Sequence, residues 1–243
     1  MKILVSQKAP ANLAAYTEIS EKYGAQIDFQ PFYLIEPLSA KEFRAQRIDL
    51  TKYTAVTFSS RLAIDAFFSL CEEFRFKVPE TMKYFCTTEM VAMYLQKHIV
   101  YRKRKIFYGD GTASSLVNLV GNKHKGEKFL ITASDTRSAE ATAGLFAKAG
   151  LDYSIAVLLK SVTQDLHDIM LSDYSVVVLY NPNDVKSLFE NFPQFQQGDI
   201  KFIAYGKSIV TAMEEAGLKI ELQGPTPEIT SAAKAIETFL SSK

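Results

Sequence analysis

One strand–helix unit occurs twice in this chain. It reads Lys2-Ile3-Leu4-Val5-Ser6 before a helical stretch that closes at Gly24, and Lys128-Phe129-Leu130-Ile131-Thr132 before one that closes at Gly150, an offset of 126 residues. Two more pairs are similar: Val56–Arg61 with Val178–Asn183 at an offset of 122, and Tyr84–Thr87 with Ile203–Gly206 at 119. Unrelated strand–helix units also look alike by chance. Offsets near half the chain length nevertheless favour two similar α/β domains, arranged as a repeat.

Short β-rich runs alternate with helical stretches along the whole chain. Glycines directly after three of the helical stretches, at positions 24, 150 and 217, suit left-handed helix ends. Alternation at this spacing predicts parallel sheets with helices on both faces. The expected strands are Ile3–Ser6, Ile27–Leu34, Ala55–Phe58, Tyr84–Thr87, Lys105–Tyr108, Phe129–Thr132, Ser175–Tyr180 and Phe202–Tyr205, and the last helix is expected at Ser231–Ser241.

The connection between the two domains is predicted to cross twice. Two stretches, Phe29–Leu38 and Ser154–Val162, are apolar and carry no helix signals. We therefore expect two neighbouring linker strands, at 35–39 and 154–163. The first domain is then discontinuous, formed by 1–34 with 164–243, and the second domain is 40–153.

Composition bounds the class of protein. The 243 residues suffice for one large or two small domains. With 47% hydrophobic and 23% charged residues, the chain is neither disordered, collagen-like nor a coiled coil. The formal net charge of +1 gives no overall electrostatic case for nucleic acid, so we expect no such partner. The two cysteines, Cys71 and Cys86, are expected to be buried free thiols.

No targeting or membrane segment is expected. The chain turns polar at Ser6-Gln7-Lys8, too early for a signal peptide, and no window reaches 18 apolar residues. We therefore expect a cytoplasmic protein with reduced thiols and no membrane partner.

Several common catalytic motifs do not occur. The sequence contains no G-x-G-x-x-G dinucleotide motif, no P-loop and no G-x-S-x-G elbow. His98, His124 and His167 lie far apart with no carboxylate at ligand spacing, which favours surface or helix-end histidines over metal ligands or bases.

The candidate binding residues follow the expected strands. In open α/β sheets, ligands bind at the carboxyl ends of strands, where backbone N–H groups open the next helix. Small polar residues at such turns suit carboxylates or phosphates, although helix capping alone also explains them. We predict a ligand site built from Ser59, Ser60, Thr87, Ser134, Asn181, Gly206, Lys207 and Ser208.

Two further segments have alternative interpretations. The basic run Tyr101–Lys105 either attracts an anion or keeps a strand edge solvated. The turn Tyr108–Thr112 either forms a flap over a cleft or is a plain loop leading into a helix capped by Thr112 or Ser114.

The order of these features resembles the uroporphyrinogen-III synthase family of tetrapyrrole biosynthesis along essentially the whole chain. Val56–Asp65 is similar to the family's F-T-S-x-x-A-V element, and Ala204–Ser208 stands where the family has I-G-x-T-T-A. Further similar segments, each weak alone, come in the family's order: Tyr101–Thr112, Phe129–Gly150, Tyr180–Phe189 and Pro225-Thr226-Pro227.

The resemblance implies two α/β domains joined by a two-stranded linker, with a cleft between them. It implies an enzyme that cyclises the linear tetrapyrrole hydroxymethylbilane, with loss of water and inversion of the last pyrrole ring. It also implies that no metal or cofactor takes part, and we expect a monomer. Two alternatives are a degenerate relative that binds a tetrapyrrole or another anion without catalysis, and an unrelated two-domain hinge protein for a small ligand.

The chain departs from the family pattern at several positions. Leu159 occupies the position of a family tyrosine proposed to help the hydroxyl leave, and Ser208-Ile209 replaces paired threonines. In the first half, Thr87 and Met90 replace a glycine and a threonine. We consider Tyr180 the candidate proton donor in place of Leu159. The alternative is that Tyr180 is a strand-end aromatic packed on a helix.

Overall fold

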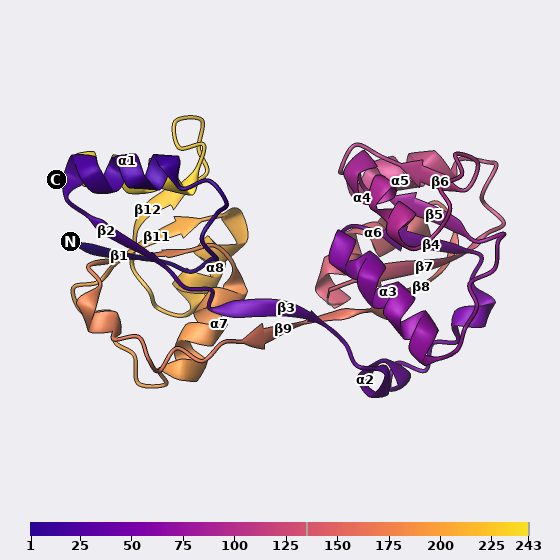
Figure 1. Cartoon of the computed structure of the whole chain (residues 1–243), viewed down its shortest axis with the longest axis horizontal. Coiled ribbons are helices and arrows are strands. Elements are labelled where there is room, and N and C mark those ends of the chain that lie inside the picture. The colour runs from indigo at the N-terminus through magenta and orange to yellow at the C-terminus, as the bar shows by residue number, and fades with distance from the viewer. Residues whose placement is uncertain (135, 243) are drawn as a thin grey trace. The chain divides into compact units, whose positions relative to one another are not determined.

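The computed structural model describes residues 1–134 and 136–242. Within these ranges, the chain divides into two compact units (Figure 1). Unit 1 is Met1–Leu34 with Val162–Lys243, and unit 2 is Ile35–Ser161. Each unit contains its own five-stranded parallel sheet.

The sheet of unit 1 has the order β12-β11-β10-β1-β2. Ile3 and Val5 of β1 face α1 and α9, and Leu4 between them faces α7 and α8. This alternation follows from the two-residue period of a strand and gives the sheet a buried face on each side. The elements are β1 (Lys2–Val5), α1 (Ala14–Tyr23), β2 (Gln26–Phe29), β10 (Val176–Leu179), α7 (Pro182–Asn191), β11 (Lys201–Tyr205), α8 (Lys207–Glu215), β12 (Ile220–Gly224) and α9 (Ala232–Ser241).

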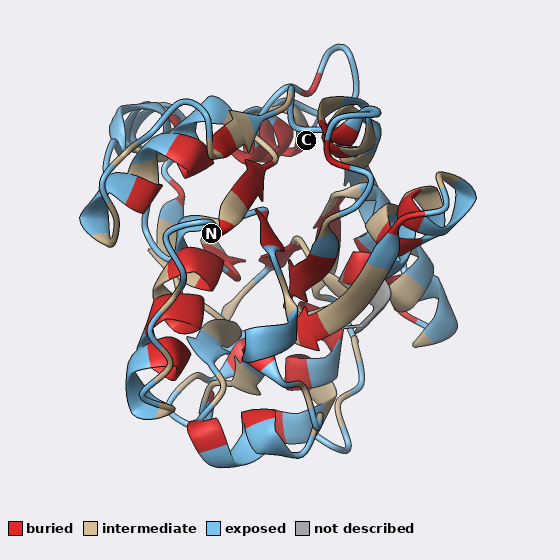
Figure 2. Cartoon of the chain, turned by 90° about the vertical axis from the view of Figure 1, so that its right-hand side faces the viewer, coloured by how far each residue is buried: buried red, intermediate tan, exposed pale blue. Residues whose placement is uncertain are grey.

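The sheet of unit 2 has the order β6-β5-β4-β7-β8. Helices α2, α3 and α4 pack on one face, and α5 and α6 pack on the other. Figure 2 shows the buried residues gathered on the strands and on one side of each helix. The elements are α2 (Ala40–Arg44), β4 (Ala55–Phe58), α3 (Arg61–Glu73), β5 (Lys83–Cys86), α4 (Glu89–Tyr94), β6 (Ile106–Tyr108), α5 (Ala113–Val120), β7 (Lys128–Ala133), α6 (Thr136–Lys148) and β8 (Asp152–Val157).

The two sheets have the same strand topology, but the corresponding groups of strands come in the opposite order along the chain. The pair β1 and β2 precedes β10 to β12, whereas the matching pair β7 and β8 follows β4 to β6. In both sheets the strand that opens the repeat, β1 or β7, lies beside the central strand β10 or β4. Ile3 pairs with Val176 and Phe129 pairs with Ala55, so the second offset is 121 residues and not the predicted 122. The N-cap residues of the helices give the same result. Ser60 corresponds to Asn181 at an offset of 121 residues, and Thr88 corresponds to Gly206 at an offset of 118 residues instead of the predicted 119.

The segments between the sheets differ from the predicted single strands. β3 (Tyr33–Pro37) and β9 (Leu159–Thr163) form a two-stranded sheet of their own. The predicted strand 154–163 is divided at Leu158, whose N–H donates to Ala133 of β7 while its carbonyl accepts from Leu38. The predicted strand Ile27–Leu34 also breaks, since β2 ends at Phe29 and Pro31 has no N–H to continue a ladder.

Helix α2 and strand β12 were not among the predicted elements. Ser39 caps α2 in a reciprocal capping box with Glu42, a signal that the sequence carries. Leu50–Lys52, Leu95–Lys97 and Leu171–Asp173 form short 3₁₀ helices. Within the described ranges, no helix is long and apolar enough to cross a bilayer.

Candidate functional site

All predicted binding residues lie at carboxyl ends of parallel strands. In unit 2, Ser59 and Ser60 follow β4, Thr87 follows β5 and Ser134 follows β7. In unit 1, Asn181 follows β10, and Gly206, Lys207 and Ser208 follow β11. Each unit therefore gathers its own share of the set at one edge of its sheet, and the predicted cleft between the domains stays a prediction.

In unit 1, the turn after β10 begins helix α7 with two reciprocal bonds. The Asn181 side chain accepts a hydrogen bond from Asn183 N–H at 3.0 Å, and Asp184 accepts one from Asn181 N–H at 3.0 Å. Pro182 occupies the first helical turn, where a missing N–H costs nothing. The prediction that Asn181 caps a helix is correct.

The Tyr180 side chain belongs to an aromatic group on the face covered by α1 and α9. Its ring meets that of Tyr205 edge-on, with centroids 5.7 Å apart, and Tyr16 of α1 meets Phe29 in the same way at 5.0 Å. The Tyr180 hydroxyl contacts that of Tyr16, and burial raises the pKa of both phenols. Tyr180 is thus half-buried and packed on the face that α1 covers, as the alternative interpretation of a strand-end aromatic holds.

Helix α8 differs from α3, α4 and α7 because no side chain caps its start. Gly206 is its N-cap residue and makes no side-chain cap, whereas Ser60, Thr88 and Asn181 cap α3, α4 and α7. Gly206 has a φ of 146°, and a Cβ there would lie 3.0 Å from the Tyr180 carbonyl oxygen. The glycine therefore lets the start of α8 approach the end of β10. Lys207 and Ser208 follow it and are exposed.

In unit 2, the corresponding turns are tied to their own helices. Ser60 accepts a hydrogen bond from Ala63 N–H at 3.1 Å, and Thr88, a residue absent from the predicted set, accepts one from Val91 N–H at 3.4 Å. Ser59 is exposed beyond its strand. Thr87 uses its main chain, which donates to Phe58 at 2.9 Å and accepts from Gly111 at 2.8 Å.

The Tyr108–Thr112 segment is therefore a loop fixed to the end of β5. Gly109 N–H donates to the Cys86 carbonyl at 3.0 Å, and Gly111 to Thr87. Thr112, one of the two predicted caps, accepts from Ser115 N–H at 3.3 Å. The basic run 101–105 precedes the edge strand β6, and its Arg102 pairs with Glu80 at 3.6 Å.

Arg61 and the residues beside it line a surface pocket that the sequence did not suggest. Its volume is about 460 Å³, and it opens between the first turns of α3 and α4. Met90 is 69% exposed, and the Arg61 guanidinium lies 3.8 Å from its sulfur and 5.5 Å from the centre of the Tyr94 ring. The lining is Arg61, Glu89, Met90, Met93 and Tyr94. Met90 is thus an exposed apolar side chain at the rim of this pocket.

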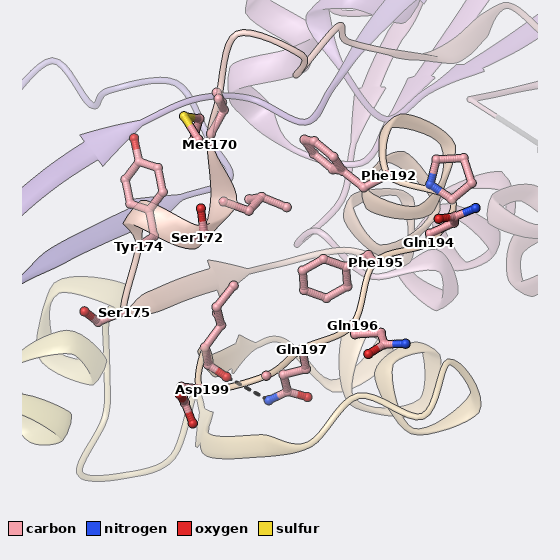
Figure 3. Close-up of a pocket in the computed structure, with 15 residues that line it drawn as sticks. Met170, Ser172, Tyr174, Ser175, Phe192, Gln194, Phe195, Gln196, Gln197 and Asp199 are labelled. Atoms are coloured by element: carbon pink, nitrogen blue, oxygen red, sulfur yellow. Dashed lines mark hydrogen bonds between the residues drawn. The ribbon is translucent and has the colours of Figure 1, made fainter.

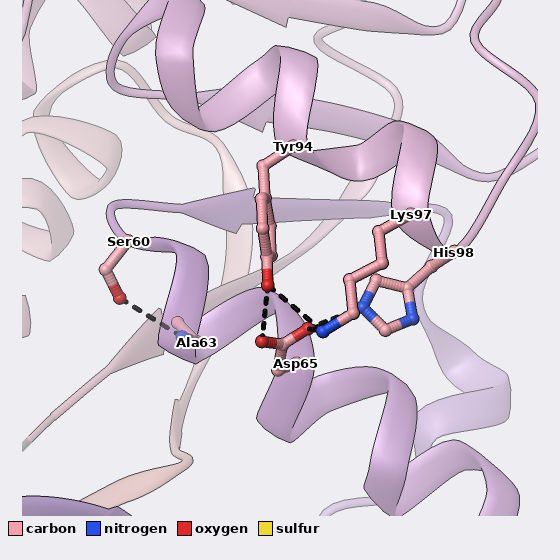
Figure 4. Close-up of polar contacts among 6 residues, drawn as sticks. All are labelled: Ser60, Ala63, Asp65, Tyr94, Lys97 and His98. Atoms are coloured by element: carbon pink, nitrogen blue, oxygen red, sulfur yellow. Dashed lines mark hydrogen bonds and ion pairs between the residues drawn. The ribbon is translucent and has the colours of Figure 1, made fainter.

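Next to Tyr94 of this pocket, the Asp65 carboxylate lies within hydrogen-bond distance of three side chains (Figure 4). Asp65 accepts from the Tyr94 hydroxyl at 2.7 Å and from Lys97 at 3.0 Å, and His98 Nε2 lies 2.7 Å away. Burial raises the pKa of Asp65, but these partners outweigh it, so that the pKa lies below the ordinary value. His98 is the C-cap residue of the 3₁₀ helix Leu95–Lys97, a helix-end histidine as predicted, and the carboxylate beside it comes from Asp65, 33 residues away in the chain.

The other two histidines have different surroundings. His167 is exposed and its Nδ1 lies 2.6 Å from Asp165. His124 is buried between the Phe85 and Phe107 rings, so it is not a surface histidine. Among the described residues, no three His, Cys, Asp or Glu side chains are grouped as metal ligands would be. Cys71 and Cys86 are buried free thiols, as predicted.

A larger groove, of about 1020 Å³, lies at the opposite edge of the unit 1 sheet (Figure 3). Its walls come from the segments that lead into β10 and β11, so it faces the amino ends of these strands. Met170, Phe192 and Phe195 line it together with glutamines. Size alone does not make it the site, because none of the predicted binding residues reaches it.

Comparison with known proteins gives the family of the chain. The family model described as uroporphyrinogen-III synthase HemD matches residues 14–234. The chain belongs to the uroporphyrinogen-III synthase family. This match sets aside an unrelated hinge protein.

Solved structures of uroporphyrinogen-III synthases have the same fold. One from Helicobacter pylori has a TM-score of 0.60 at 16% identity, covering 100% of this chain and 99% of that one. A mutant from Thermus thermophilus has a TM-score of 0.53 at 14% identity, with 100% and 98% covered. No curated protein matched the sequence. At these identities the structures support the fold alone, and the family rests on its model.

Leu159, on strand β9, carries no group that could donate a proton. It is 4% exposed and belongs to the apolar core of unit 2. Lys160, next to it, is paired with Glu42 at 2.7 Å, which together with Ser39 holds the pKa of that carboxyl at about 2. Leu159 therefore cannot donate a proton, and the Lys160 ammonium beside it is already paired.

Proposed function

We propose that this chain closes hydroxymethylbilane to uroporphyrinogen III, expelling the terminal hydroxyl as water and inverting the last pyrrole ring. The observation that carries the proposal is the family match over 14–234. The reaction requires help for the departing hydroxide, a folded pose for a flexible chain with eight carboxylates, and shielding of a cationic intermediate. Positioning and exclusion of water supply much of the reduction in barrier.

The start of α8 is the part of unit 1 best suited to hold a carboxylate. Its first N–H groups have no side-chain cap at Gly206, and the helix dipole favours an anion there. Lys207 adds a positive charge and Ser208 a hydroxyl, both exposed. Among the described residues, no carboxylate forms an ion pair with Lys207, which leaves its ammonium available to substrate.

In unit 2, we assign substrate binding to the main chain of the turns and to the exposed hydroxyl of Ser59. Ser60 already accepts from Ala63. We assign Thr87 and Ser134 to the same edge as contacts of lesser weight. Loss of a single hydroxyl in this group is expected to change the rate by about tenfold or less, near the worth of one hydrogen bond.

Tyr180 is the hydrogen-bond donor that we assign to the departing hydroxyl. Burial raises its pKa, so the phenol stays protonated at neutral pH and acts as a donor and not as a base. It lies one residue before Asn181 at the carboxyl end of β10, on the edge that carries the α8 start. Lys160 is the weaker choice because Glu42 already pairs with it.

An assay that separates the III isomer from the I isomer tests the function. The chain is expected to direct hydroxymethylbilane to the III isomer. Tyr180→Phe is expected to lower kcat by about 10²- to 10⁴-fold, the usual worth of general acid help. Tyr23→Phe, at the far end of helix α1, is the matched control and should leave kcat unchanged. Wild-type activity in Tyr180→Phe would exclude that residue as the donor. Binding of the substrate without formation of the III isomer would instead establish a degenerate, non-catalytic relative.

A further inference from the structure

The carboxylate of Asp184 is buried directly behind the Tyr180–Asn181 turn. Its Oδ2 atom accepts three hydrogen bonds: from Tyr180 N–H at 2.8 Å, from Asn181 N–H at 3.0 Å, and from the Ser6 hydroxyl at 2.9 Å. The residue is 0% exposed, and its other oxygen, Oδ1, has no hydrogen-bond partner among the described residues. Asp184 therefore ties β1, the end of β10 and the start of α7 to one atom.

This arrangement is more than helix capping requires. A capping box needs only that the N3 side chain accept from the N-cap N–H, which here is the bond from Asn181. The bonds from Tyr180 and Ser6 are additional. Burial raises the pKa of Asp184 to about 6 even though three donors favour the ionised form. Buried titratable groups held at such a cost are concentrated at functional sites.

The corresponding turn of unit 2 shows whether the fold itself requires a buried carboxylate at this position. At the 121-residue offset, Asp184 corresponds to Ala63 and Asn181 to Ser60. There the helix starts with the Ser60 hydroxyl alone, which accepts from Ala63 N–H at 3.1 Å. Thr132, the counterpart of Ser6, donates to the Thr57 carbonyl at 2.6 Å instead. The same strand–turn–helix thus forms with no carboxylate beneath it.

The turn that Asp184 holds carries the candidate donor. The main chain of Tyr180 is fixed by the Asp184 bond, and from that point its ring reaches Tyr205 and its hydroxyl reaches Tyr16. We propose that Asp184 is a positioning residue for the cyclisation, whose Oδ2 atom fixes the backbone of Tyr180 and Asn181 so that the Tyr180 hydroxyl meets the substrate. This proposal rests on the proposed function of the unit 1 edge.

Two substitutions separate positioning from bulk stability. Asp184→Ala removes the acceptor, and kcat should fall by about 10- to 100-fold, the worth of hydrogen bonds to a charged group, with KM nearly unchanged. Asp184→Asn keeps an oxygen for all three donors, and kcat should stay within about threefold of wild type. Lys186→Ala is the control, on the same helix but exposed and paired with Glu190 at 3.6 Å.

Thermal unfolding of each variant is measured beside the kinetics, with formation of the III isomer from hydroxymethylbilane as the activity. Wild-type kcat in folded Asp184→Ala overturns the proposal, as does an equal loss in the Asn and Ala variants. A loss that only follows the unfolded fraction also overturns it. If Asp184→Ala does not fold, Ser6→Ala removes one of the three donors, and an unchanged kcat there counts against the proposal. A wild-type chain that forms no III isomer shows instead that the proposed function itself has failed.

Discussion

The Ser6 hydroxyl donates a hydrogen bond of 2.9 Å to the Asp184 carboxylate, joining two residues 178 positions apart. Ser6 directly follows β1, and Asp184 lies in the first turn of α7. The bond therefore links the two segments of unit 1 that unit 2 separates in the chain. The Asp184 carboxylate is buried where water cannot solvate its charge, so the stability of unit 1 depends on pH.

Asp184 is expected to make unit 1 more stable in mild acid. Its pKa is raised from 3.8 to about 6, so the folded chain binds the proton more tightly than the unfolded chain. The stabilisation is complete below pH 3.8 and is lost as the pH rises through about 6. The difference is worth about 2 to 3 kcal/mol. Urea unfolding of wild type and Asp184→Asn at pH 4, 6 and 8 measures it. The gain of the Asn variant over wild type should grow with pH, and a gap independent of pH would contradict the assignment.

His124 is expected to make unit 2 less stable in mild acid, the opposite of the effect of Asp184 on unit 1. Its buried Nδ1 has no hydrogen-bond partner among the residues that the structure describes, and burial together with Lys83 lowers its pKa. The unfolded chain therefore binds the proton more tightly, and stability is lost as the pH falls through the ordinary histidine value of 6.5. His124→Phe retains a ring between Phe85 and Phe107 and cannot titrate. Wild type should lose stability relative to this variant between pH 7.5 and 5, and parallel curves would refute the prediction.

Replacing Leu159 by tyrosine is expected to damage the fold without adding activity. The site is 4% exposed within the unit 2 core, so a larger ring with a hydroxyl overpacks it. The expected loss is about 1 to 3 kcal/mol, against less than about 1.5 kcal/mol for the control Leu159→Met. Chemical denaturation and the isomer assay measure both effects. A stable Leu159→Tyr chain with a raised rate would show that this position still serves as the family's tyrosine does.

Gly206→Ala is expected to displace the start of α8. The new Cβ would lie 3.0 Å from the Tyr180 carbonyl oxygen at a φ of 146°, which costs about 1 to 3 kcal/mol. We expect a rise in KM as well, because the first N–H groups of α8 move. Gly144→Ala is the control, since it lies within helix α6 with no atom within 4 Å of the added Cβ. That change should stabilise the chain by about 0.5 to 1 kcal/mol. Equal effects of the two substitutions would contradict the argument.

The sequence by itself determined the fold class and the edges on which the candidate residues lie. Apolar runs of strand length followed by small polar residues predict strand–turn–helix units, and parallel pairing then brings the ends of the strands to one edge. Asn181, Ser60 and Thr112 are the caps that local chemistry predicts, since a cap depends on residues two or three positions away. The repeat was also visible, but two of its three offsets were one residue out because strand sequences alone do not fix register.

Which side chains meet depends on the packing of segments that are distant in the chain. Asp184 reads in the sequence as one more polar residue near a helix start, and nothing local indicates Ser6 as its partner across 178 residues. Likewise, Asp65 and His98 come into contact because α3 packs beside α4. The Tyr180 side chain points to the face of the sheet that α1 covers, which the sequence pattern does not indicate. Burial, and the pKa shifts that it causes, arise from the packing of segments distant in the chain, so no pattern of neighbouring residues contains them.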